Sequence, residues 1–168
     1  MNVKPQYQLA TLLLFVIAIV TALTTTACGN SKSLTKEQRL AGFEKSAAVI
    51  ETKSGERHRF TVYLAITSTQ RKQGLSFITG LAREEGMLFV FPQPQPIRMW
   101  MKNTPTSLDM LFVDQRGSVL KIVRNTTPNS TESIRSGTHA AAVLELDAGT
   151  ASRLNIDVGD RLLHERLN

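Results

Sequence analysis

Apolar and polar positions divide the chain into an N-terminal apolar run, a polar segment and a longer region of short alternating stretches. In residues 57–66, polar or aromatic side chains alternate with four apolar ones, at Phe60, Val62, Leu64 and Ile66. This period of two predicts a strand with one face on a core. Residues 87–91 are a continuous apolar run, again of strand length. The Pro-Gln-Pro-Gln-Pro stretch at residues 92–96 predicts a loop, because three prolines remove three backbone donors.

Further strands are predicted at residues 49–52, 97–101, 108–114, 118–123, 140–146 and 161–165. Two short helices are expected between them. Thr67, with Gln70 three residues later, has the pattern of a capping box, and Gly74 ends that helix. Asp147 is positioned to cap a second helix that runs through Asn155. Residues 125–138 are rich in Thr, Asn and Ser and predict a surface loop.

Residues 47–168 are of the usual size for one domain with one core. About seven strands, mostly linked as hairpins, with two short helices indicate an α+β class that is mainly antiparallel β. We expect a compact, barrel-like single domain.

The N-terminal region has the order of a secretory signal peptide, predicted here as residues 1–27. Lys4 supplies positive charge, and the apolar run from Leu9 to Leu23 is shorter than the roughly 20 residues of a spanning helix. The run leads to Cys28, the only cysteine in the chain. This end resembles a lipobox, although Thr25 stands where an aliphatic residue is usual. We therefore predict lipidation of Cys28 and a flexible tether over residues 28–46.

Two alternatives to a lipoprotein stay open, namely an uncleaved membrane anchor and ordinary secretion with a chance cysteine. The lipid anchor predicts an exported protein that is held at a membrane and faces the periplasm or the cell surface. One cysteine cannot form an internal disulfide, so the domain depends on its core for stability.

The net charge of +6 is spread along the chain without a basic block, so nucleic acid is not an expected partner. The three histidines lie in separate segments and predict no metal site. No phosphate-binding glycine loop, dinucleotide fingerprint or nucleophile elbow is present, and we predict no cofactor. A protein partner cannot be named from the sequence.

Residues 99–112 combine large apolar side chains with polar groups that are costly to bury without partners. The polar residues are Lys102, Asn103 and Thr104, between two predicted strands, and Asp109 within the second. Asp109 shares a strand face with Leu111 and Val113, and Glu145 lies similarly between Leu144 and Leu146. Lys102, Arg71 and Arg98 are the candidate cations for these carboxylates.

Three interpretations of this motif remain open. Lys102 and Asp109 could lock a turn as a structural polar knot. Alternatively, Lys102 could hold an anionic ligand that Asn103 and Asp109 orient in a pocket. In a catalytic interpretation, Asp109 or Glu145 is the acid or base and Lys102 stabilises charge. Trp100 is either ordinary core or a flat wall against which a sugar or aromatic ligand stacks.

Six segments resemble the DUF192 family of uncharacterised bacterial and archaeal proteins, in the family's order. They are residues 73–75, 86–91, 101–104, 108–112, 143–146 and 156–160. The family usually has an arginine where this chain has Ile78. The resemblance implies a compact, mainly antiparallel β fold and frequent export, but no established activity. It favours Lys102, Asn103, Thr104, Asp109 and Glu145 as site residues, with Arg71 next.

The sequence therefore predicts a lipid-anchored envelope protein that binds a small anionic or carbohydrate-like ligand. An envelope enzyme and a structural or partner-binding lipoprotein are the alternatives.

Overall fold

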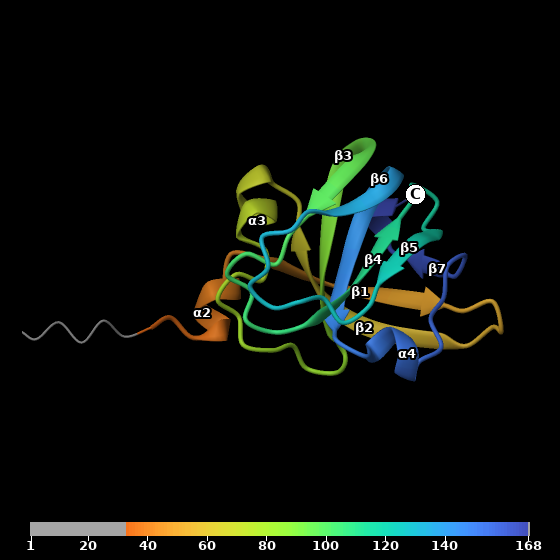
Figure 1. Cartoon of the computed structure of the whole chain (residues 1–168). Coiled ribbons are helices and arrows are strands. Elements are labelled where there is room, and N and C mark those ends of the chain that lie inside the picture. The colour runs from red at the N-terminus through yellow and green to blue at the C-terminus, as the bar shows by residue number, and fades with distance from the viewer. Residues whose placement is uncertain (1–32, 168) are drawn as a thin grey trace, which may run out of the picture. The chain divides into compact units, whose positions relative to one another are not determined.

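Seven strands form one sheet in a computed structural model that describes residues 33–167. The strands are β1 (Glu44–Glu51), β2 (Arg57–Ala65), β3 (Glu85–Met99), β4 (Leu108–Val113), β5 (Val119–Val123), β6 (Ile134–Asp147) and β7 (Arg161–Leu163). Their order in the sheet is β5-β4-β6-β3-β2-β1-β7 (Figure 1). Only β2 and β3 pair in parallel, and every other neighbouring pair is antiparallel.

The two outer strands of the sheet approach each other and nearly close it. Ser118, just before β5, bridges to Arg161 in β7, and the amide of Leu162 donates to the carbonyl of Gly117 at 2.7 Å. A side chain at Gly117 would collide with this contact, because a Cβ there would lie 2.1 Å from the Leu162 carbonyl oxygen. The predicted α+β, mainly antiparallel, barrel-like domain is confirmed.

Both faces of the sheet are buried over much of its area. One apolar cluster draws on all seven strands and fills the interior of the nearly closed sheet. A second cluster lies on the outer face of β2, β3, β4 and β6, where loops and short helices cover it. The prediction that β2 buries only one face is therefore wrong for its second half, since Tyr63 and Ala65 belong to the outer cluster.

Within residues 33–167, three short α-helices and one 3-10 helix accompany the sheet: α2 (Lys36–Leu40), α3 (Ser68–Gln73), α4 (Thr150–Arg153) and η1 (Glu165–Leu167). The capping box of Thr67 and Gln70 is confirmed at the start of α3. The predicted cap at Asp147 is wrong. The residue before α4 is Gly149, which has a φ of 79° and no side chain to cap the helix.

The proline-rich stretch does not end β3, which continues through residues 92–96 to Met99. Beyond Phe89, β3 pairs only with β6, so one edge is free, and its register with β6 shifts between Val90 and Gln95. Exposed prolines are compatible with a free edge and a bulge. The predicted loop and the separate strand at residues 97–101 are therefore wrong.

Two other predictions about the strands also need correction. β3 and β4 are not a hairpin, because β6 lies between them in the sheet. Residues 102–104 consequently belong to the connection that passes from β3 to β4. β6 begins at Ile134, inside the segment predicted as a surface loop.

Residues 34–46, predicted as part of the tether, belong to the folded unit, which begins at Leu34. Leu40 and Phe43 are buried in the outer cluster. The side chain of Gln73 in α3 donates to the carbonyl of Arg39 at 2.8 Å. The domain therefore starts earlier than residue 47.

The predicted signal peptide and the lipidation of Cys28 lie outside the described residues. Within residues 33–167, no helix is long and apolar enough to cross a bilayer.

Candidate functional site

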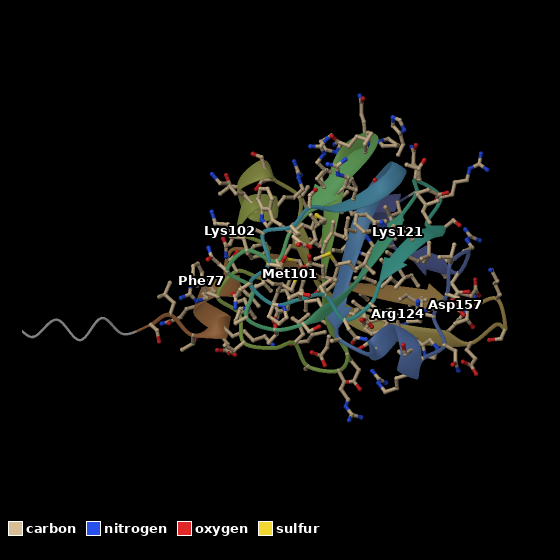
Figure 2. All side chains as sticks on the ribbon, viewed as in Figure 1. Phe77, Met101, Lys102, Lys121, Arg124 and Asp157 are labelled. Carbon is tan, nitrogen blue, oxygen red and sulfur yellow. The ribbon has the colours of Figure 1, made fainter. Side chains whose placement is uncertain are left out.

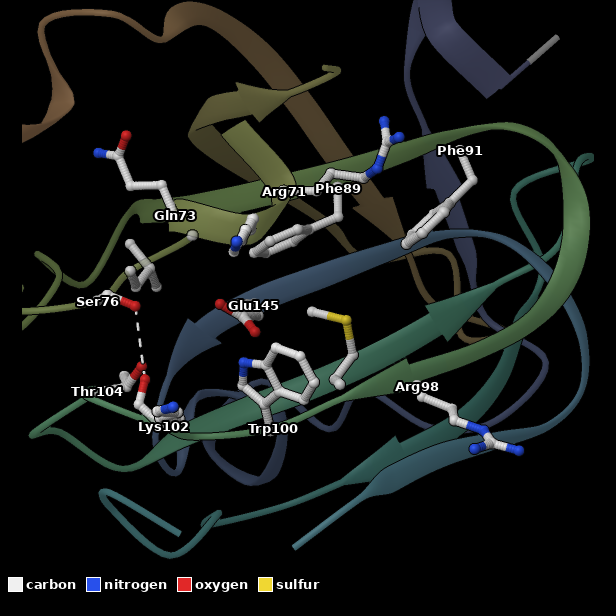
Figure 3. Close-up of a pocket in the computed structure, with 14 residues that line it drawn as sticks. Arg71, Gln73, Ser76, Phe89, Phe91, Arg98, Trp100, Lys102, Thr104 and Glu145 are labelled. Atoms are coloured by element: carbon white, nitrogen blue, oxygen red, sulfur yellow. Dashed lines mark hydrogen bonds between the residues drawn. The ribbon is translucent and has the colours of Figure 1, made fainter. Parts of the chain in front are cut away.

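A cavity of about 250 Å³ opens on the outer face of the sheet (Figure 3). One side is formed by α3 and the residues that follow it, and the other side by the second half of β3. Its lining includes three aromatic side chains, four cationic ones and a single carboxyl group. The lining residues are Arg71, Lys72, Gln73, Gly74, Leu75, Ser76, Phe89, Phe91, Arg98, Met99, Trp100, Lys102, Thr104 and Glu145.

The walls of the cavity are aromatic because of the way β3 runs. Phe89 and Phe91 are two positions apart and share a face, and the continuation of the strand brings Trp100 to the opposite side. Phe89 is buried, whereas 56% of Trp100 is exposed. The carboxyl group of Glu145 lies between the rings of Phe89 and Trp100 (Figure 3). These rings offer flat apolar surfaces to a ligand.

Glu145 comes from β6, in the middle of the sheet, where it pairs with Met87 on one side and Met110 on the other. Only 4% of the residue is exposed, its carboxyl group borders the cavity, and no hydrogen bond from another of residues 33–167 contributes to its pKa. Burial raises the pKa of Glu145 to about 8. The group is therefore protonated at neutral pH, and it can both donate and accept a hydrogen bond.

The four cations around the cavity differ in their freedom. Arg71 donates to the carbonyl oxygens of Ile66 and Val90, the latter at 3.0 Å, and its guanidinium lies 5.0 Å from the ring centre of Phe91. Arg71 thus joins α3 to the strands. Lys72, Arg98 and Lys102 are exposed, and within residues 33–167 none forms an ion pair. These three can move to meet an anion.

Five of the seven predicted binding residues line the cavity: Arg71, Trp100, Lys102, Thr104 and Glu145. Asn103 does not. It has a φ of 60°, its carbonyl accepts from the amide of Phe77 at 2.7 Å, and its side chain lines a neighbouring hollow beside α2. Ile78, where the family usually has arginine, is buried in the outer cluster and is absent from the cavity lining.

Asp109 is the second predicted residue that lies away from the cavity. It faces the interior of the sheet, where its carboxylate accepts from the amides of Asn125 at 2.9 Å and Ala151 at 2.8 Å. The bond from Ala151 caps α4, which has no cap of its own. No ion pair joins Asp109 to Lys102, so the interpretation of these two residues as a structural knot is wrong. Asp109 is also not placed to act on a ligand in this cavity.

The sequence analysis did not find the aromatic wall at Phe89 and Phe91 or the cation Lys72 as parts of the site, and it named Arg98 only as a candidate cation for the buried carboxylates. The spacing of the two phenylalanines already put them on one face. Their approach to Glu145 depends on the pairing of β3 with β6, for which the sequence carries no local signal. Among the described residues, no group of three or more His, Cys, Asp or Glu side chains is arranged to hold a metal ion.

These features define the class of protein. It is a barrel-like α+β domain with a cavity on its outer face, and the cavity has aromatic walls and a rim of cationic side chains. The chain belongs to the DUF192 family, described as "Uncharacterized ACR", whose model matches residues 49–164. No curated protein gave a significant match.

Several solved structures are similar to this chain, and two of them illustrate the relationship. A protein from Sinorhizobium meliloti 1021, described as a candidate transcription regulator, is 44% identical, with a TM-score of 0.71 over 72% of this chain and 94% of that chain. A protein of unknown function from Novosphingobium aromaticivorans DSM 12444 is 33% identical, with a TM-score of 0.72 over 84% of this chain and 99% of that one.

Proposed function

We propose that this protein is an exported, lipid-anchored domain of the cell envelope that binds a small anionic ligand in the cavity around Glu145. The observation that carries the binding proposal is a nearly buried carboxyl group that borders an aromatic cavity and, among residues 33–167, has no hydrogen-bond donor that contributes to its pKa. A polar group in that position is costly unless a ligand or water satisfies it.

The lining specifies the chemistry of the ligand. Lys72, Arg98 and Lys102 attract a carboxylate or phosphate, and the aromatic walls accept an apolar ring or the face of a sugar. The protonated Glu145 donates a hydrogen bond to an oxygen or nitrogen of the ligand body. A small organic acid or sugar phosphate with one flat face meets all three conditions.

Export and lipid anchoring are supported by the sequence features of residues 1–28, namely a short apolar run that leads to the only cysteine. The test is inhibition of lipoprotein processing in cells, together with a Cys28→Ser variant. We expect both to abolish maturation of the protein to its smaller membrane-bound form. Unchanged size and membrane partitioning would contradict the anchor.

Ligand binding is tested on the purified full chain by thermal shift, with four probes that separate charge from shape: benzoate, benzyl alcohol, glucose 6-phosphate and glucose. A ligand at 100 times its Kd adds about 2.7 kcal/mol of stability, which raises the Tm by several degrees in a domain of this size. We expect shifts with one or both anions and much smaller ones with their neutral counterparts.

Two substitutions assign a shift to this cavity. Lys102→Ala should reduce the response to the anionic probes, whereas Lys45→Ala, which changes an exposed lysine outside the cavity, should not. Glu145→Gln keeps a neutral hydrogen-bonding group and should retain part of the response at pH 7. No shift with any probe, or equal shifts in the Lys102→Ala protein, would contradict the proposal.

An enzyme is the second candidate, and the raised pKa of Glu145 in a cavity is the observation that favours it. A group with a pKa of about 8 acts as a general acid at neutral pH. Turnover of a bound probe that is lost in Glu145→Gln would support this candidate over binding alone.

A further inference from the structure

The surface beside the cavity has an unusual concentration of exposed apolar side chains. Among the described residues, four large apolar side chains are more than half exposed: Leu34, Phe77, Trp100 and Val158. Trp100 lines the cavity, and Leu34 and Phe77 line the adjoining hollow beside α2, which shares Lys72, Gln73 and Ser76 with the cavity. Three of the four therefore lie on one continuous surface, which we call the α2–α3 face.

Phe77 is held outward by its backbone. Its φ of 62° lies in the left-handed region, which is a rare conformation for a bulky residue. A hydrogen bond of 2.7 Å from its amide to the carbonyl of Asn103 fixes this conformation, and the ring stays 56% exposed. The guanidinium of Arg39 lies 5.1 Å from the ring centre. A strained residue that displays an aromatic ring to solvent indicates a binding role.

The α2–α3 face is positively charged. The residues that line its two hollows include five cations, Arg39, Arg71, Lys72, Arg98 and Lys102, and one acid, Glu145. Glu145 is buried and protonated at neutral pH, so it does not offset the positive charge. Glu37 on α2 is an exposed acid that directly precedes Gln38 and Arg39 of this face, but it lines neither hollow.

The position of this face along the chain is also informative. Leu34 is the first residue of the folded unit, and it lies in the hollow beside α2. Leu34 is only six positions after Cys28, and an extended chain of that length reaches about 20 Å. A domain anchored at Cys28 would therefore keep this face close to the bilayer.

We infer that the α2–α3 face docks on an anionic lipid surface, with Leu34, Phe77 and Trp100 at the level of the headgroups and Arg39, Lys72 and Lys102 against the lipid phosphates. Aromatic and aliphatic side chains mixed with Lys and Arg are the usual composition of such interfaces. The inference rests on the proposed function only for the location of the domain beside a membrane, and it does not require a ligand in the cavity. The end of the domain that carries Phe77 and Lys102 lies opposite Asp157, the neighbour of Val158 (Figure 2).

Trp100 is the only tryptophan in the chain and provides a direct test. The full chain is reconstituted in vesicles of phosphatidylcholine alone or with 30 mol % phosphatidylglycerol, with and without brominated acyl chains. We expect a blue shift of the Trp100 emission and quenching by bromine only in the vesicles that contain phosphatidylglycerol. Because the docking is electrostatic in part, about 0.5 M salt should reverse both effects.

Variants on the α2–α3 face separate this inference from the proposed ligand site. Phe77→Ser and Arg39→Gln change residues outside the cavity and should reduce the docked fraction, with Arg39→Gln weakening docking about fivefold. Val158→Ser is the matched control for loss of an exposed apolar side chain and should behave as the wild type. Glu145→Gln should leave quenching unchanged while it alters probe binding.

Equal emission of Trp100 in both lipid compositions and in buffer would overturn the inference. Quenching that survives in Phe77→Ser and Arg39→Gln would overturn it as well.

Discussion

Asp109 and Glu145 are both buried acids on neighbouring strands, yet they lie on opposite faces of the sheet and in opposite circumstances. Asp109 is fully buried in the interior and accepts hydrogen bonds from two backbone amides. Glu145 is nearly buried on the outer face, and burial raises its pKa to about 8 without a hydrogen bond from any of the residues 33–167 to offset it. The first group organises the fold, and the second is available to a ligand.

This contrast shows why burial alone does not identify a functional carboxylate. A buried carboxylate with its donors in place stabilises the structure around it. A carboxyl group that is buried without donors becomes neutral and remains available for hydrogen bonding. The following predictions test this difference, from the largest expected effect to the smallest.

Asp109→Ala should cost on the order of 3–5 kcal/mol of unfolding free energy, because the amides of Asn125 and Ala151 lose their acceptor. Denaturant unfolding at pH 7 measures this loss. Asp109→Asn keeps one acceptor and should lose less. A loss below about 1 kcal/mol in the alanine variant would show that Asp109 does not hold α4 and the segment after β5.

Stability should fall as the pH rises from about 4.5 to about 8, because folded Glu145 keeps its proton while the unfolded chain loses it. The fall should reach up to about 5 kcal/mol and level off above pH 8. Glu145→Gln should remove most of this slope, which unfolding curves at several pH values would show. An identical pH dependence in the two proteins would mean that Glu145 is charged in the folded state.

Arg71→Ala should cost about 1–3 kcal/mol, because its guanidinium donates to two backbone carbonyls that join α3 to the strands. Lys102→Ala, the matched control in the same cavity, should change stability by no more than about 0.5 kcal/mol. Both values come from denaturant unfolding. A loss above about 3 kcal/mol from Lys102→Ala would show that Lys102 stabilises the fold. It would contradict the proposal that this lysine is free to bind a ligand.

Local patterns predicted the secondary structure where the determinants are close in sequence. The capping box at Thr67 and Gln70 needs only four residues, and the alternation in β2 gave the correct inner face. The same logic put Asp109 correctly with Leu111 and Val113. Local patterns gave the wrong prediction for β3. Its prolines are tolerated because one edge of the strand is free beyond Phe89, where the pairing with β2 ends.

The candidate site was predicted in part for the same reason. Lys102, Thr104, Trp100 and Glu145 stand out in the sequence as polar or aromatic residues in unusual settings, and Arg71 is a candidate cation for the carboxylates. All five line one cavity. Asn103 and Asp109 were grouped with them by sequence proximity, but a left-handed turn and the opposite strand face take them elsewhere. Phe89 and Phe91 were missed because their role depends on what lies across the sheet.

The sequence by itself determined the class of fold, the family and which residues carry unusual chemistry, because strand periodicity, caps and motifs are written in neighbouring positions. Only the tertiary structure decided that β6 lies between β3 and β4 and that β5 and β7 meet at Gly117. It also decided that the carboxyl group of Glu145 faces an aromatic cavity and does not form an ion pair with a cationic side chain of residues 33–167. Sheet order and register join residues far apart in the chain, and they follow from the packing of the whole core.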